Sequence, residues 1–170
     1  AILAPNSGNL QVWRFIIIKD EEKREEIAIA CLQQKWMTQA PVHIVILADL
    51  DTMKRHYNER AKLYCAQDSA LAANNIMLTA TSLNIDSCFI SAFNEDMLKR
   101  ALDTPSNLEP YVVITLGYSN EKPEEKKRYN ASSLTYFDVY DDHAQDKSIF
   151  PLTKFKQDIK KEINKVKRKI

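Results

Sequence analysis

The residues of this 170-residue chain that could bind a ligand gather in one short loop near its amino terminus. The loop combines Asn6, Ser7, Gly8, Asn9 and Gln11, which are small or carry an amide. Such a loop offers backbone N–H groups, and each amide adds an acceptor oxygen beside a donor nitrogen. We predict that Asn9 and Gln11 face the polar edge of a flat heteroaromatic ligand. The same residue types also build ordinary tight turns, so the loop alone leaves both interpretations open.

A second candidate site lies where an apolar segment, residues 87–92, ends in Ser91 and Ala92. Small side chains at the end of a strand let backbone N–H groups approach a ligand closely, although the segment also fits a plain core strand. Cys88 lies in the same segment and has no histidine near it in sequence. We therefore interpret Cys88 as a packing residue rather than a nucleophile, because free cysteines usually pack like small apolar residues.

A third candidate site is the charged segment 121–128, in which Lys126 and Arg128 could bind a phosphate group. Arginine binds phosphate through two parallel hydrogen bonds, and lysine adds a point charge. The alternative is a solvated run of charges, and the sequence by itself favours that alternative.

Composition excludes several classes of protein. Only two glycines occur, which excludes a GxGxxG dinucleotide fingerprint and a P-loop. The three cysteines are far apart and the three histidines have no metal-like or triad-like spacing, so we expect no metal site and no disulfide framework. The formal net charge of +1 gives no electrostatic case for nucleic acid. No apolar run approaches the roughly 20 residues of a membrane helix, and we expect a cytoplasmic protein.

The elements that must position these residues follow from apolar patterning. Strands are expected at residues 13–19, 43–48, 87–92 and 111–116, and helices at 21–34, 68–83, 94–102 and 152–170. Asp20, Asp68 and Asn94 are the expected helix N-caps. Residues 49–67 are expected to form a short helix or a flexible excursion. The irregular alternation of strands and helices predicts an α+β domain with a mixed sheet.

Two of the expected helices have unusual surfaces. Helix 68–83 is apolar almost all round, which predicts a core helix that also lies at a subunit interface. Helix 152–170 carries a narrow apolar stripe and many basic residues. We divide the chain into a domain at residues 1–150 and this basic helix at 151–170, which either belongs to the same domain or packs on a partner subunit.

Five segments, taken in order, resemble the FMN-dependent nitroreductase family. APNSGNLQVW at residues 4–13 resembles the family's APSSxNxQPW loop, and AP at 40–41 precedes a strand similar to its next one. Residues 68–80 resemble its DAAIAAQNLLLAA helix, 87–93 its TCWIGGF strand, and 111–118 its IPLGYP strand. The resemblance covers about residues 1–140.

The resemblance implies an α+β fold, with a mainly antiparallel sheet surrounded by helices, and a homodimer that holds FMN at its interface. It also implies ping-pong transfer of two electrons from NADH or NADPH, through flavin N5, to a nitro compound, quinone or similar acceptor. No catalytic side chain is expected, because the flavin carries the chemistry. Carried over by position, the flavin-binding residues are Pro5, Asn6, Ser7, Asn9 and Gln11, the backbone of Ile90, Ser91 and Ala92, and the phosphate ligands Lys126 and Arg128.

The chain departs from the family pattern in ways that leave alternatives open. Asn6 stands where the family has Ser, Val12 where it has Pro, and Asn84-Ile85-Asp86 where it has a glycine-rich turn. The family's Arg-rich amino-terminal motif is absent, and we expect a preceding segment to carry it. The alternatives are a reductive dehalogenase or flavin-destructase-like member of the same fold, or a degenerate flavin-binding interaction protein without turnover.

Overall fold

The structure is a computed structural model that describes residues 1–121 and 123–142. The chain divides into a compact unit, Ala1–Lys122, and a second unit that begins at Pro123. The predicted helix at 152–170 and His143 lie outside the described residues.

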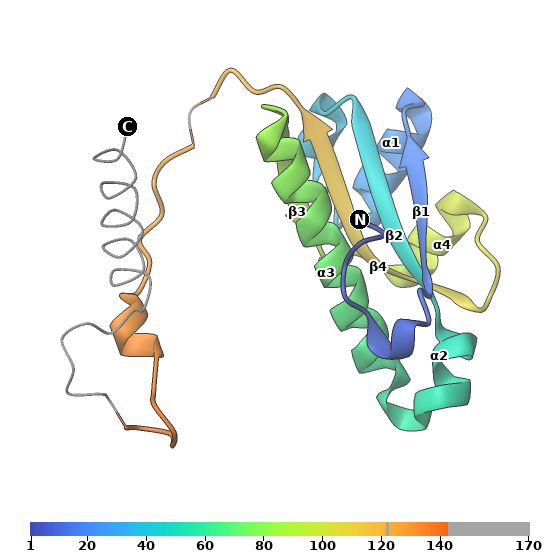
Figure 1. Ribbon diagram of the computed structural model, residues 1–170. Coiled ribbons are helices and arrows are strands. Elements are labelled where there is room, and N and C mark those ends of the chain that lie inside the picture. Colours follow the sequence, from blue (N-terminus) through green and yellow to red (C-terminus); the bar gives the residue numbers. More distant parts are fainter. Residues whose placement is uncertain (122, 143–170) are drawn as a thin grey trace, which may run out of the picture. The chain divides into compact units, whose positions relative to one another are not determined.

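A four-stranded sheet forms the centre of the first unit (Figure 1). Its strands are β1 (Trp13–Ile18), β2 (Val42–Asp49), β3 (Asp86–Ile90) and β4 (Leu108–Gly117), in the order β1-β2-β4-β3. All three pairings between these strands are antiparallel, which confirms the α+β class and the mainly antiparallel sheet that the resemblance implies. The mixed sheet expected from the alternation of elements is wrong for the described strands, because none of them pairs in parallel. The central strands β2 and β4 are continuous apolar runs because both of their faces are covered. Strands β1 and β3 are the two edges.

Helices cover both faces of the sheet. Helices α1 (Glu21–Ala30) and α4 (Glu95–Leu102) lie on one face, and α3 (Ala61–Ser82) lies on the other (Figure 1). On the α1 and α4 side, Val45, Leu47 and Val113 of the sheet join one buried cluster. On the α3 side, the alternate residues Ile46 and Val112 join another, as the two-residue period of a strand requires. The remaining helices are α2 (Leu50–Tyr57) and the short 3-10 helices η1 (Ser7–Asn9), η2 (Lys35–Gln39), η3 (Asn58–Arg60) and η4 (Ala131–Leu134).

Two expected helix starts are confirmed by their cap hydrogen bonds. The carboxylate of Asp20 accepts from the backbone N–H of Lys23 at 2.9 Å, and the side chain of Asn94 accepts from that of Met97 at 2.9 Å. Helix α1 ends at Ala30, earlier than the predicted Gln34, because Leu32 and Gln33 both adopt positive φ and cannot continue the helix.

The predicted start of the long helix at Asp68 is wrong, because α3 begins at Ala61. The polar stretch before Asp68 conceals two further turns, which bury Ala61 and Cys65, four residues apart on one face. Helix α2 precedes them, and Asn58, at a φ of 46°, redirects the chain between the two helices. Asp68 is therefore an interior residue of the helix, and its carboxylate is free to bond elsewhere.

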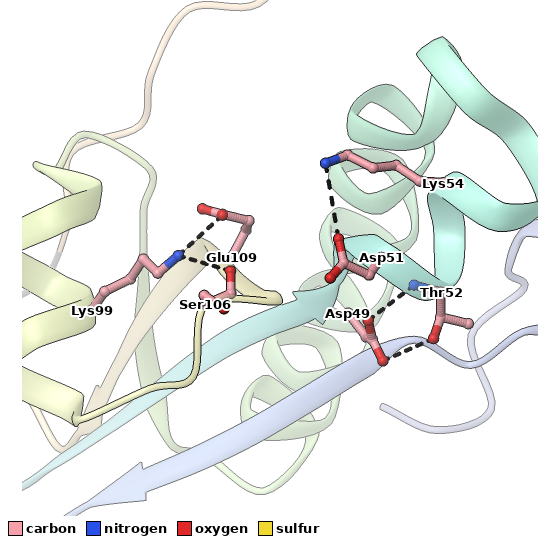
Figure 2. A network of polar contacts seen from close by, with 7 residues as sticks. All are labelled: Asp49, Asp51, Thr52, Lys54, Lys99, Ser106 and Glu109. Carbon is pink, nitrogen blue, oxygen red and sulfur yellow. Dashed lines mark hydrogen bonds and ion pairs between the residues drawn. The ribbon is translucent and has the colours of Figure 1, made fainter.

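Side-chain contacts join α2 and α4 to the ends of the central strands (Figure 2). Asp49 caps α2 by accepting from the backbone N–H of Thr52 at 3.0 Å and from its hydroxyl at 2.8 Å. Burial opposes ionisation of this carboxyl, but the hydrogen bonds from Thr52 and Asn107 and the charge of Arg14 together outweigh burial and lower the pKa of Asp49. Lys99 of α4 forms an ion pair with Glu109 of β4 at 3.0 Å and donates to the carbonyl of Ser106 at 3.3 Å.

Among the described residues, no helix combines the length and the apolar character needed to cross a bilayer. Within the same part of the chain, no group of three or more metal-ligating side chains is assembled.

Candidate functional site

The amino-terminal loop adopts a backbone that few residue types accept. Gly8, Asn9 and Gln11 all have positive φ, at 57°, 56° and 49°. Asn visits this region more readily than most non-glycine residues, whereas Gln does so seldom. The conformation must therefore be held in place by contacts, because a non-glycine residue in this region stores about 1 to 3 kcal/mol of strain.

Amide side chains within the loop bond to one another. The backbone N–H of Gln11 donates to Asn6 Oδ1 at 3.1 Å, and Gln11 Nε2 donates to the carbonyl and to Oδ1 of Asn9, both at 3.3 Å. Asn9 Nδ2 and Gln11 Oε1 have no hydrogen-bond partner in the described part of the chain. The predicted pair Asn9 and Gln11 thus lies together and exposed, with a donor and an acceptor free for a ligand edge.

The loop is fastened to α3 through Ser7. The backbone N–H of Ser7 lies 3.1 and 3.0 Å from the two carboxylate oxygens of Asp68, and its hydroxyl donates to Oδ1 at 2.9 Å. Asp68 is only 2% exposed. Both donors of Ser7 are therefore directed at the helix rather than at solvent.

Tyr57 of α2 holds the loop from a second side. A Cβ added to Gly8 would come within 2.5 Å of Tyr57 Oη, so the hydroxyl of Tyr57 packs directly against Gly8. The ring of Tyr57 packs edge-on against Tyr64 of α3, with centroids 4.8 Å apart. Arg60 stacks over Tyr64 and donates to its hydroxyl at 3.2 Å.

A shallow depression of about 620 Å³ lies between the loop and α3. Pro5, Asn6 and Ser7 line one side, and Gln67, Asp68, Ala70 and Leu71 line the other. Three of the predicted cofactor-binding residues therefore border one cavity. Its helix side was not predicted, because Asp68 had been assigned to a helix cap.

The second predicted segment lies at the opposite edge of the sheet. Ile90 is buried at the end of β3, and Ser91 and Ala92 follow it as exposed residues. The carbonyl of Ala92 accepts from Gln34 Nε2 at 3.4 Å. Strands β2 and β4 lie between this turn and the strand that follows the loop, so one chain does not bring the two predicted segments together.

Cys88, in contrast to the packing role predicted for it, is exposed on the edge strand β3. The sequence could not show this, because the residues of a strand do not reveal whether it lies at the edge or in the middle of its sheet. Cys31 and Cys65 are buried, and burial raises the pKa of their thiols to about 12 and about 11. These two thiols therefore stay protonated near neutral pH and are poor nucleophiles.

Lys126 and Arg128 belong to the second unit, where both are exposed. Arg128 Nη1 donates to the carbonyl of Lys127 at 3.2 Å. Their assignment as phosphate ligands stays a prediction.

Sequence reasoning missed Asp68 and Tyr57 as residues of the loop site. Asp68 is visible in the sequence as an acidic residue beside Ser69, but these residue types are also typical of a helix start, so they do not identify a contact with the loop. Nothing in the local sequence identifies Tyr57, because its contact with Gly8 spans 49 residues of chain.

Comparison with known proteins identifies the class of fold. The oxidoreductase YcnD of Bacillus subtilis, described as hypothetical, superposes with a TM-score of 0.74 at 23% identity, covering 82% of this chain and 61% of that one. An FMN-dependent nitroreductase of Clostridium difficile superposes with a TM-score of 0.62 at 30% identity, covering 82% and 80%. The fold is therefore nitroreductase-like.

The sequence matches give the family itself. The signature described as "Nitroreductase family" matches residues 28–118, more than half of the chain. A protein of Archaeoglobus fulgidus provisionally named NADH dehydrogenase/NAD(P)H nitroreductase is 31% identical over 135 residues, covering 77% of this chain and 73% of its own. The chain belongs to the nitroreductase family, which confirms the resemblance found in its motifs and the nitroreductase type of oxidoreductase that the resemblance implies.

Proposed function

We propose that this protein is an FMN-dependent oxidoreductase that moves two electrons from NADH or NADPH to nitroaromatic, quinone or similar acceptors. Membership of the nitroreductase family and a solved relative described as an FMN-dependent nitroreductase support this assignment. Bound FMN would supply the electron chemistry at its N5 atom, with hydride coming from the nicotinamide and electrons passing to the acceptor. The chain would bind and orient it.

The observation that carries the proposal is the placement of the two predicted contact segments. The loop precedes β1 and the Ser91–Ala92 turn follows β3, at opposite edges of the sheet. Three strand spacings of about 4.8 Å separate the edge strands, roughly 14 Å in all. A site between two copies of the chain would let the loop of one copy and the turn of the other meet the same flavin.

The residues present fit a flavin. Free donor and acceptor atoms on Asn9 and Gln11 match a ring with polar edges, and the apolar wall at Ala70 and Leu71 suits a flat aromatic surface. The backbone at Ser91 and Ala92 would lie near N5. Lys126 and Arg128 would bind the phosphate, so Arg128→Ala is expected to weaken FMN retention.

A homodimer is part of the proposal. Large apolar side chains remain exposed on α3 and the amino terminus, among them Leu78 at 62% and Leu3 at 91% exposure. Leu71, on the wall of the depression, is exposed as well. A partner subunit would cover this surface.

The buried free thiols of Cys31 and Cys65 also support a reducing compartment, which we take to be the cytoplasm.

The decisive experiment is titration of the purified protein with FMN, followed by anaerobic reduction with NADH and NADPH in turn. We expect quenching of flavin fluorescence, bleaching of the flavin band by at least one nicotinamide, and reoxidation by a quinone or nitroarene. Light scattering at micromolar concentration should give the mass of a dimer. Unquenched FMN fluorescence would refute the oxidoreductase assignment, whereas binding without reduction would identify a flavin-binding protein without turnover.

A further inference from the structure

We infer that Asp68 is a positioning residue, which holds the amino-terminal loop in its ligand-binding conformation through Ser7. This inference rests on the proposed function, because it assigns the loop to cofactor binding. It changes the role expected for Ser7, which becomes an anchor of the loop instead of a flavin ligand.

The contacts of Ser7 support this division of roles. Its backbone N–H and its hydroxyl both donate to the carboxylate of Asp68, at distances between 2.9 and 3.1 Å. A donor that already bonds to a buried carboxylate is not available to a phosphate or a ribityl chain. The amide groups of Asn9 and Gln11, which lie two and four residues further on, keep a donor and an acceptor for a ligand.

The conformation of the loop explains why an anchor is needed. Three of its residues have positive φ, and two of these are not glycine. A strained loop relaxes into other conformations unless contacts outside it fix its course. Asp68 provides such a contact from a helix 22 residues long. Without it, the binding atoms of Asn9 and Gln11 would have to be ordered at the moment of binding, at a cost in affinity.

The charge of Asp68 also limits which part of the ligand can occupy the depression. Asp68 lines this depression, and none of the ion pairs among the described residues involves it. A carboxylate at this point repels a phosphate group but tolerates a neutral ring. The phosphate end of FMN should therefore bind away from α3.

Paired substitutions test the anchor from both sides. Asp68→Asn leaves one acceptor oxygen and removes the negative charge, so the Ser7 N–H loses one of its two contacts and both Ser7 donors lose a charged acceptor. Ser7→Ala removes the hydroxyl, and Ser7→Thr keeps it. We expect Asp68→Asn and Ser7→Ala each to raise the FMN dissociation constant about tenfold, the size of one lost hydrogen bond to a charged group. Ser7→Thr should stay near the wild-type value.

The double variant Ser7→Ala/Asp68→Asn should lose less affinity than the sum of the two single changes, because both remove the same contact. The matched control is Asp96→Asn, which removes an exposed carboxylate from α4 on the other face of the sheet. It should leave the FMN dissociation constant unchanged.

Amide hydrogen exchange without FMN gives a readout that does not depend on the cofactor. Asp68→Asn should speed exchange of the Ser7 amide while amides in β2 and β4 stay protected. Unchanged exchange at Ser7, or unchanged FMN affinity in both Asp68→Asn and Ser7→Ala, would overturn the inference and leave the proposed function standing. If the wild-type protein binds no FMN, the proposed function fails, and the exchange data still decide whether Asp68 orders the loop.

Discussion

The two segments assigned to cofactor binding are built in opposite ways. The Ser91–Ala92 turn is the direct continuation of β3, and Asn94 begins the next helix two residues later. The amino-terminal loop instead depends on contacts with Asp68 and Tyr57, which are distant in sequence. The turn is thus fixed by its neighbours along the chain, and the loop by packing. The difference predicts that substitutions at the turn change stability, whereas substitutions at the loop change binding.

The largest effect is expected for Ile90→Ala, at the end of β3. Ile90 is 4% exposed and belongs to the cluster between the sheet and helices α1 and α4. Removing a buried isoleucine typically costs about 2 to 5 kcal/mol of the free energy of unfolding. Urea denaturation should show this loss. A loss below about 1 kcal/mol would mean that the β3 edge is not part of the core, and the comparison would lose its basis.

The second prediction concerns Gly8→Ala in the loop. The added methyl group would meet Tyr57 Oη at 2.5 Å, and the φ of 57° is itself unfavourable for alanine. Because the loop can shift to relieve this strain, we expect FMN affinity to fall by about 2 kcal/mol, or roughly 30-fold, while the midpoint of urea denaturation falls less than for Ile90→Ala. Fluorescence titration measures the first quantity.

A compensating substitution sharpens this test. Tyr57→Phe removes the clashing oxygen, and the next ring atom lies 3.6 Å from the added methyl, an ordinary contact. Gly8→Ala/Tyr57→Phe should therefore bind FMN more tightly than Gly8→Ala alone, although the cost of the φ angle remains. Equal affinity of the two variants would show that Tyr57 does not restrain the loop.

The same contrast explains what the sequence could predict. The four strands, the caps at Asp20 and Asn94 and the family motifs depend on neighbouring residues and are readable from them. Asp68 was misread because a cap and an interior helix residue look alike until the fold shows what the carboxylate accepts. The separation of the loop from Ser91 follows from the strand order β1-β2-β4-β3, which no local pattern encodes. Tyr57 and Gly8 likewise meet only in the folded chain.

A smaller effect is expected for Asn94→Ala, next to the turn. The Asn94 side chain caps α4, and its backbone N–H donates to the carbonyl of Ala30 at 2.8 Å, a bond that alanine keeps. Loss of the cap should cost about 1 kcal/mol of the free energy of unfolding. FMN affinity should fall less than for Gly8→Ala. A larger loss of affinity at Asn94 than at Gly8 would reverse the comparison.

The smallest expected effect is a pH dependence of the free energy of unfolding, which arises in the central sheet between the two regions. His43 of β2 is fully buried, its Nε2–H donates to the carbonyl of Met37 at 2.9 Å, and Nδ1 has no partner among the described residues. Burial lowers the pKa of His43 below the ordinary 6.5, nearby Arg24 lowers it further, and the bond to Met37 only partly opposes them. Above pH 6.5 the imidazole is neutral in both the folded and the unfolded chain. As the pH falls below 6.5, the unfolded chain gains a proton that the folded chain excludes, so the free energy of unfolding decreases until the folded pKa is passed.

Urea denaturation between about pH 5 and pH 7 should show this slope in the wild type and in the exposed-histidine control His56→Gln. His43→Gln, which keeps a donor for Met37 but does not titrate, should flatten it, and an undiminished slope in that variant would assign the pH dependence to groups other than His43.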